Sequence, residues 1–298
     1  MKYTKPALSF VEQAQRLLDR GLIAPDKETL VRLLSVVNYY RLSAYWYPFR
    51  HIDPATGEEY FDSGTKYEII WRRYTFDRRL RLLVMDAIEH IEVAILRTKM
   101  VENFTLEHGP FGYCKPSNFR TGLDHGRLMS ETENAVGRSN EKFVQRFFSK
   151  YTSEPRLPLW MAAEVMTFGQ LFTFFRFLHL KEQQYLARTF DIYPPVLESW
   201  LHTLNFTRNT CAHHARLWNR EIPIRPKLPK NNPEWHDPVK INNQRVFAIL
   251  TVLKYLLSYI APQTDWSSRL LSLMDEYDDI PLRNMGFPDN WQESTLWR

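Results

Sequence analysis

Residues 65–103 read TKYEIIWRRYTFDRRLRLLVMDAIEHIEVAILRTKMVEN, a stretch that contains neither proline nor glycine. Its apolar residues recur at steps of three and four, which is the spacing of one face of an α-helix. These residues are Phe76, Leu80, Leu83, Val84, Ala87, Ile88, Ile91, Ala94 and Ile95. At 1.5 Å per residue the helix would be roughly 55 Å long. The stretch therefore predicts one long helix that forms the spine of the domain.

The sequence before this stretch also predicts helices. Ser9 and Glu12 have the spacing of a capping box, and Gly21 stands where the helix they begin should stop. Asp26 can cap a second helix that runs to about residue 37, and residues 38–46 form a short aromatic helix. The turn-rich residues 51–64 separate this N-terminal part from the long helix.

The sequence after the long helix has the same helical spacing and no convincing run of alternating strand residues. The proline-rich residues 221–238 are expected to form a surface excursion. Further helices are expected at residues 119–136, 140–151, 159–178 with a break at Gly169, 181–190, 194 to about 217, 242–260 and 264–277. The predicted fold class is therefore all-α.

Composition excludes several function classes. The chain has 298 residues but 10 glycines, and none of them forms a dinucleotide fingerprint or a P-loop. The net charge is 39 − 34 = +5, which suits a polyanionic partner without proving one. Two cysteines and the absence of a signal-peptide pattern predict a cytoplasmic protein. The longest apolar stretch, residues 246–261, contains Lys254 and is too short for a membrane span.

Reactive side chains are densest in residues 208–220, RNTCAHHARLWNR. On a helix, His213 would lie about 40° from Asn209 and Arg216 about 20° on the other side, so the three would share a face. The long side chain of Arg208 could bend toward them. Histidine can move the 2′-hydroxyl proton of RNA near neutral pH, and arginine can stabilise the charge that develops on phosphorus. The alternative is that the histidine only satisfies the last carbonyls of a helix.

This segment resembles the signature of the Abi-like family of bacterial abortive-infection proteins (the AbiD/AbiF type), whose R-x4-H element places them in the HEPN superfamily. Other stretches that resemble the family are KPALSFVEQAQRLLDRGL, NYYRLSAYWYPF, YTFDRRLRLLVMDAIEHIEVAILRT, LPLWMAAEVMTFGQL and MGFPDNW. The resemblance implies a HEPN-like helical bundle with an additional N-terminal helical segment. We expect residues 1–60 to form that segment, residues 65–262 the core, and residues 263–298 a C-terminal helix and tail.

The resemblance also implies an activity and a set of site residues. The activity is metal-independent RNA cleavage that leaves a 2′,3′-cyclic phosphate, in phage defence, by a homodimer that pairs two motif helices. The catalytic residues would be Arg208, Asn209 and His213. Residues of the extended motif, with less certain roles in RNA binding, are His214, Arg216, Asn219 and Arg220.

Charged residues of the long helix are further candidates. Its arginines surround the helix axis, so they form no single stripe, and some should pair with Glu68 and Asp77 at four-residue spacing. The remainder could contact RNA phosphate; the candidates are Arg72, Arg73, Arg78 and Arg79. Glu89 and Glu92 could orient the motif arginine or histidine across the helix pair, or lie on a salt-bridged surface.

No metal or other cofactor is expected, because adjacent helical residues such as His213 and His214 diverge by about 100°. The aromatic groups of residues 39–47 and 168–177 could stack on bases, although packing between helices is the more usual role. Two rival functions remain open: a protein that binds a structured RNA without cutting it, and an interaction protein that recognises a phage component.

Overall fold

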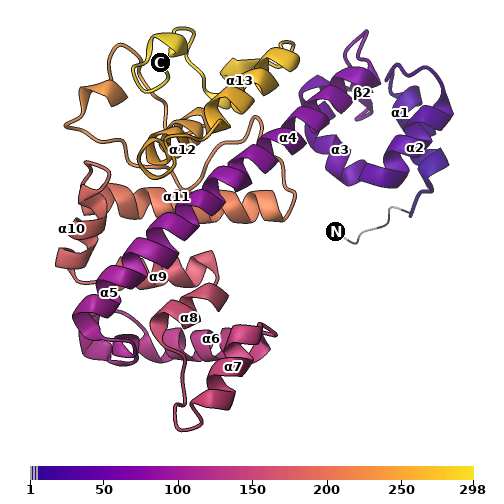
Figure 1. Ribbon diagram of the computed structural model, residues 1–298. Helices are drawn as coiled ribbons and strands as arrows, with labels where there is room; N and C mark the ends of the chain where they lie inside the picture. The colour runs from indigo at the N-terminus through magenta and orange to yellow at the C-terminus, as the bar shows by residue number, and fades with distance from the viewer. Residues whose placement is uncertain (1, 3, 5) are drawn as a thin grey trace.

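A computed structural model describes residues 2, 4 and 6–298, and the all-α prediction is confirmed. Helix α4 (Tyr67–Ile91) continues through a π-helical stretch, η2 (Glu92–Met100), into α5 (Val101–His108). Figure 1 shows the three as one rod that crosses the molecule. The rod passes the expected end at residue 103 and stops at Gly109, whose φ of 77° suits glycine. The predicted spine is thus present, and longer than expected.

The elements before α4 form an N-terminal lobe, residues 10–61, that lies beside the first turns of α4 (Figure 1). It contains α1 (Phe10–Asp19), α2 (Lys27–Val37) and α3 (Tyr39–Trp46), followed by a single turn, η1 (Tyr47–Phe49). The predicted capping box of Ser9 and Glu12 is confirmed, and so is the Asp26 cap, which accepts from the N–H of Thr29 at 2.6 Å. The expectation of no strands was wrong here, because β1 (Arg50–Ile52) and β2 (Glu59–Phe61) pair antiparallel. Strands of three residues are too short to show alternation.

The rest of the chain packs along the rod. The segment between α5 and α6 forms two short turns, η3 (Gly112–Cys114) and η4 (Pro116–Asn118). Helices α11, α12 and α13 contact α4, while α8, α9 and α10 contact η2 (Figure 1). The bounds are α6 (His125–Arg138), α7 (Lys142–Lys150), α8 (Leu159–Val165), α9 (Phe168–Phe177), α10 (Leu180–Arg188), α11 (Pro194–Ala212), α12 (Val246–Ile260) and α13 (Trp266–Glu276). Single turns follow at η5 (Pro233–Trp235), η6 (Leu282–Met285) and η7 (Trp291–Glu293).

Three further expectations about the positions of elements in the chain need correction here. The break between α8 and α9 lies at Met166–Thr167 rather than at Gly169, because Thr167 caps α9 in a capping box with Gln170. Helix α6 begins at His125 rather than at residue 119, after the cap Asp124. The excursion of residues 221–238 is not confined to the surface, since the Trp235 side chain is fully buried.

The core lies against one face of α4. Seven of the nine predicted apolar positions are buried, and the other two, Leu83 and Ala94, are half-buried. Among the aromatic groups, Tyr45, Trp46 and four of the five phenylalanines of α9 are buried, whereas Tyr40 and Tyr47 are exposed. In the part of the chain that the structure describes, no helix combines the length and the apolar character that crossing a bilayer requires.

Candidate functional site

The motif segment lies where α11 ends. The helix stops at Ala212 rather than near residue 217, so the prediction of its C-terminus was wrong. The N–H of His214 donates to the carbonyl of Cys211 at 2.9 Å, and that of Ala215 to the carbonyl of Thr210 at 3.0 Å. These two bonds are those of a Schellman C-cap, in which His214 takes the left-handed conformation with φ of 57°. Arg216 therefore lies beyond the helix and does not share its face.

The three predicted catalytic residues lie at this exposed end. Asn209 and His213 are exposed, and Arg208 is half-buried. The Arg208 Nη1 atom lies 3.4 Å from Asn209 Oδ1, to which it donates a hydrogen bond. The His213 N–H donates to the backbone carbonyl of Asn209 at 3.0 Å. Asn209 is thus bonded to both partners, and none of the three side chains is sequestered in the core.

The N-terminal lobe holds the turn that follows. Arg41, on α3, donates from Nη1 to the His214 carbonyl at 2.7 Å. In return, Arg216 donates from Nη1 to the carbonyl of Ala44, also on α3, at 2.5 Å. Two hydrogen bonds in opposite directions therefore attach residues 214–216 to α3. The sequence did not predict this contact, because about 170 residues separate the partners, a separation over which no local pattern extends.

The remaining residues of the extended motif lie close to the same turn. His214 is exposed, and Asn219 takes a left-handed conformation with φ of 53°. The Arg220 guanidinium donates to the carbonyl of Arg216 at 3.3 Å and lies 5.5 Å from the centre of the Phe206 ring. The guanidinium groups of Arg216 and Arg220 thus bond to the protein's own backbone.

A buried carboxylate anchors the segment after the motif. Asp77, on α4, is completely buried, and its Oδ1 accepts from the N–H groups of Leu217 at 3.1 Å and Trp218 at 2.6 Å. Its Oδ2 accepts from the Tyr45 hydroxyl at 2.6 Å and pairs with Arg81. The predicted four-residue pairing of Asp77 is confirmed with Arg81. The sequence did not predict that this pair is buried. It also did not predict that Asp77 forms hydrogen bonds with the segment directly after the motif.

Burial raises the pKa values of several groups in and near this network. Desolvation raises the pKa of Asp77, an effect that Arg81, the Tyr45 hydroxyl and the two amides oppose because they favour the carboxylate. Desolvation also raises the pKa of the Tyr45 hydroxyl. The thiol of Cys211, one turn before the Schellman cap, is 4% exposed, and its burial raises its pKa to about 12. Cys211 is therefore not a nucleophile at neutral pH.

The arginines of α4 are mostly engaged within the chain. Arg72 binds Asp279, and Arg79 pairs with Glu276, so both hold the segment around α13. The Arg73 guanidinium lies between two rings, 4.1 Å from the centre of Phe49 and 5.0 Å from that of Trp218. Arg78 is exposed and has no hydrogen-bonding or ion-pair partner among the described residues. RNA contact by these four arginines stays a prediction.

The two candidate acidic residues differ in their surroundings. Glu92, in the π-helical stretch, forms a half-buried ion pair with Arg97. Arg97 in turn donates to the backbone carbonyls of Ala163 and of Met166, the latter at 2.9 Å, and so caps the end of α8. Glu89 is exposed. Within the described part of one chain, no hydrogen bond joins either carboxylate to Arg208 or His213, so a role across two chains stays a prediction.

Within the described residues, no group of three or more His, Cys, Asp or Glu side chains is arranged to hold a metal ion. The end of α11 carries imidazole, guanidinium and amide groups, which can move protons and bind phosphate oxygens.

Comparison with known proteins assigns the family. The family model described as Abi-like protein matches residues 32–219, a region that starts in α2 and ends in the extended motif. The stretches of residues 5–22 and 285–291 that also resembled the family lie outside this match. No curated protein and no solved structure matches the chain. Because the match covers more than half of the 298 residues and includes the cluster of residues 208–220 except Arg220, the chain belongs to the Abi-like family.

Proposed function

We propose that this protein is a metal-independent endoribonuclease of the HEPN type that acts in the cytoplasm in phage defence, by abortive infection. The observation that carries the proposal is the position of Arg208, Asn209 and His213 at one exposed end of α11. This end lies inside the region that matches the Abi-like family. An RNA strand can therefore reach the imidazole and the guanidinium without any rearrangement of the core.

The reaction is an in-line transesterification. His213 accepts the proton of the 2′-hydroxyl as that oxygen attacks the adjacent phosphorus, and so acts as the general base. The bond from phosphorus to the 5′-oxygen breaks, and that oxygen takes up a proton. The products are a 2′,3′-cyclic phosphate and a 5′-hydroxyl. Arg208 stabilises the charge on the phosphorane oxygens, and Asn209, bonded to Arg208, orients it.

The same proposal includes a homodimer. One proton is removed and another is delivered, whereas the end of α11 carries one motif histidine per chain, His213. The other R-x4-H spacing of the chain, Arg120–His125, lies elsewhere, and the ring of its histidine is bonded to the Tyr113 carbonyl. Two motif ends that face each other would supply one imidazole for each step. The exposure of Asn209 and His213 leaves this end of α11 available to a second copy.

The test is RNA cleavage in the presence of EDTA by the wild type, His213→Ala and a matched control, His90→Ala. His90 is an exposed histidine on α4, remote in sequence from the motif. The wild type and the control should cleave a labelled RNA to 2′,3′-cyclic phosphate ends, and His213→Ala should be slower by about 10²- to 10⁴-fold. Equal cleavage by His213→Ala, or cleavage only with added metal, would contradict the proposal.

The same protein samples distinguish a ribonuclease from the two alternative functions. A wild type that binds RNA but yields no cyclic phosphate ends, with equal affinity in His213→Ala, would identify a non-cleaving RNA-binding protein. A wild type that neither binds nor cuts RNA would favour the interaction protein, whose phage protection should then survive His213→Ala.

A further inference from the structure

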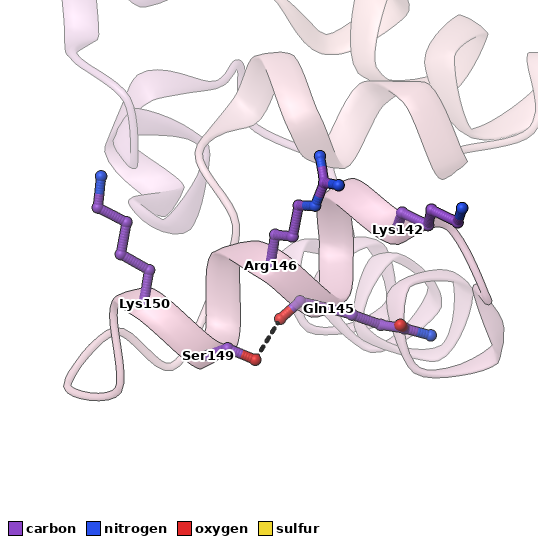
Figure 2. Close-up of a pocket in the computed structure, with 5 residues that line it drawn as sticks. All are labelled: Lys142, Gln145, Arg146, Ser149 and Lys150. Carbon is purple, nitrogen blue, oxygen red and sulfur yellow. Dashed lines mark hydrogen bonds between the residues drawn. The ribbon is translucent and has the colours of Figure 1, made fainter.

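Helix α7 has one apolar side and one basic side. Its sequence is KFVQRFFSK. Val144 is buried, and Phe143, Phe147 and Phe148 are half-buried against the core. The opposite side lines a shallow hollow of about 570 Å³, shown in Figure 2. Its lining residues are Lys142, Gln145, Arg146, Ser149 and Lys150, all of them exposed. The hollow therefore has three cationic side chains and no acidic one.

The three cations are regularly spaced. Lys142, Arg146 and Lys150 stand four residues apart, so they lie within an arc of about 80° and rise about 6 Å from one to the next. In Figure 2 the Arg146 and Lys150 side chains extend to the same side of the helix from successive turns. The row is about 12 Å long in total. This is a linear array of positive charge rather than a pocket for a small anion.

None of the three cations forms an ion pair with another described residue. Some exposed cations of this half of the chain are in ion pairs, such as Arg127 with Glu131 and Arg156 with Glu133, whereas the three cations of α7 are in none. Like charges four residues apart destabilise a helix by a few tenths of a kcal/mol per pair. Binding an external polyanion would relieve this repulsion. The charge pattern thus favours a negatively charged partner over a merely solvated surface.

The length and spacing of the row of cations fit the phosphates of a nucleic-acid strand. A strand in a duplex carries one phosphate per about 3.4 Å of axis, so about three phosphates face a row of 12 Å. The Tyr151 ring lies directly after the row and is 46% exposed, with the Lys150 Nζ 5.2 Å and the centre of the Phe147 ring 4.9 Å from its centre, so an aromatic side chain stands next to the cations. A membrane surface fits less well, because the apolar side of α7 is packed inward and cannot enter lipid.

We propose that the exposed face of α7 binds the phosphate backbone of RNA, as a docking surface separate from the Arg208–His213 end. The choice of RNA rests on the proposed function, whereas the phosphate contact rests on α7 itself. In Figure 1, α7 lies at the end of the molecule opposite the N-terminal lobe, which holds the motif turn through Arg41 and His214. In Figure 1 the end of α11 lies between that lobe and α7. RNA that contacts both places must span the separation between α7 and the end of α11, so α7 would favour longer or structured RNA over short fragments.

The test measures binding without cleavage. The probe is a fluorescein-labelled 20-nucleotide 2′-O-methyl RNA, which keeps the phosphates but lacks the attacking hydroxyl. Its dissociation constant is measured by anisotropy between 50 and 300 mM salt for the wild type, a triple variant with Lys142→Gln, Arg146→Gln and Lys150→Gln, and a matched control. The control carries Lys227→Gln, Lys230→Gln and Lys240→Gln, the same loss of charge at three other exposed positions. Circular dichroism checks that all three proteins are folded.

The α7 variant should bind at least about 10-fold more weakly at 150 mM salt, and the slope of log affinity against log salt should fall by about 2, since each lost phosphate contact removes about 0.7. The control should match the wild type. Equal affinity and slope in the α7 variant and the control would overturn the proposal, as would α7-dependent binding to phosphatidylserine vesicles but not to RNA. Failure of the cleavage test leaves this readout unaffected, because the probe cannot be cut.

Discussion

The Oδ1 atom of Asp77 accepts a hydrogen bond from the backbone N–H of Trp218 at 2.6 Å, although 141 residues separate the two in the sequence. The same carboxylate accepts from Tyr45 of α3 and pairs with Arg81 of α4. One buried charge therefore joins the spine, the N-terminal lobe and the segment that follows the motif. The position of the motif turn depends on this network as well as on the helix that carries Arg208.

Replacing Asp77 with Asn should strongly destabilise the protein. The substitution keeps the size of the side chain but leaves Arg81 buried without its counter-charge, a change that costs about 3–5 kcal/mol. Urea denaturation followed by circular dichroism measures the loss. The control is Asp86→Asn, which removes an exposed pair with Arg269 and should cost less than about 1 kcal/mol. Similar unfolding midpoints for the two variants would contradict the structural role of Asp77.

The Arg216→Ala variant should lose activity more than stability. Its guanidinium donates to the carbonyl of Ala44, so its removal frees one side of the turn that directly follows His213. We expect kcat/KM for RNA cleavage to fall about 10-fold, equivalent to about 1.4 kcal/mol in the barrier. Arg32→Ala, at an exposed position on α2, is the control. A mutant with unchanged cleavage but faster proteolysis after residue 213 would show that the contact only stabilises the fold.

The thiol of Cys211 should be unreactive in the folded protein. Burial raises its pKa to about 12, so almost no thiolate exists at pH 8, and the side chain is also shielded from reagents. In a Cys114→Ser variant, which leaves Cys211 as the sole cysteine, a disulfide reagent should label the native protein negligibly within minutes. The unfolded protein should yield one thiol per chain. Rapid native labelling would show that the end of α11 opens readily.

The ion pair of Arg72 and Asp279 should stabilise the protein only above acidic pH. The Arg72 guanidinium lowers the pKa of Asp279 below its usual value, so the pair contributes above the unfolded pKa of about 4 and its contribution is lost as pH falls through the lower folded value. Asp279→Asn should slightly lower the urea midpoint at pH 7 and leave it unchanged near pH 2. Asp275→Asn, at an exposed position on α13, is the control. An equal loss for Asp279→Asn at both pH values would exclude this ionic contribution.

The Schellman caps of α1 and α11 show where sequence-based prediction works and where it stops; in the first, the N–H groups of Gly21 and Leu22 donate to the carbonyls of Leu18 and Leu17. At the end of α1, Gly21 takes the left-handed conformation with φ of 91°. Because glycine favours this conformation, the sequence alone predicted that the helix ends there. At the end of α11 the same position holds His214, which gives no such signal, so the predicted helix ran on to residue 217. The error misplaced Arg216 but not Arg208, Asn209 or His213, which come before the turn.

The sequence by itself determined the helical fold, the spine and most of its buried face, the caps at Ser9 and Asp26, and the location of the reactive cluster. All of these follow from periodicity or from contacts within four residues. Only the tertiary structure decided that Asp77 is buried and bonded to the N–H of Trp218, and that α3 forms hydrogen bonds with residues 214–216. It also decided that the cations of α7 form no ion pair with another described residue. The physical reason is that burial and charge pairing depend on neighbours brought from distant parts of the chain, which local spacing does not encode.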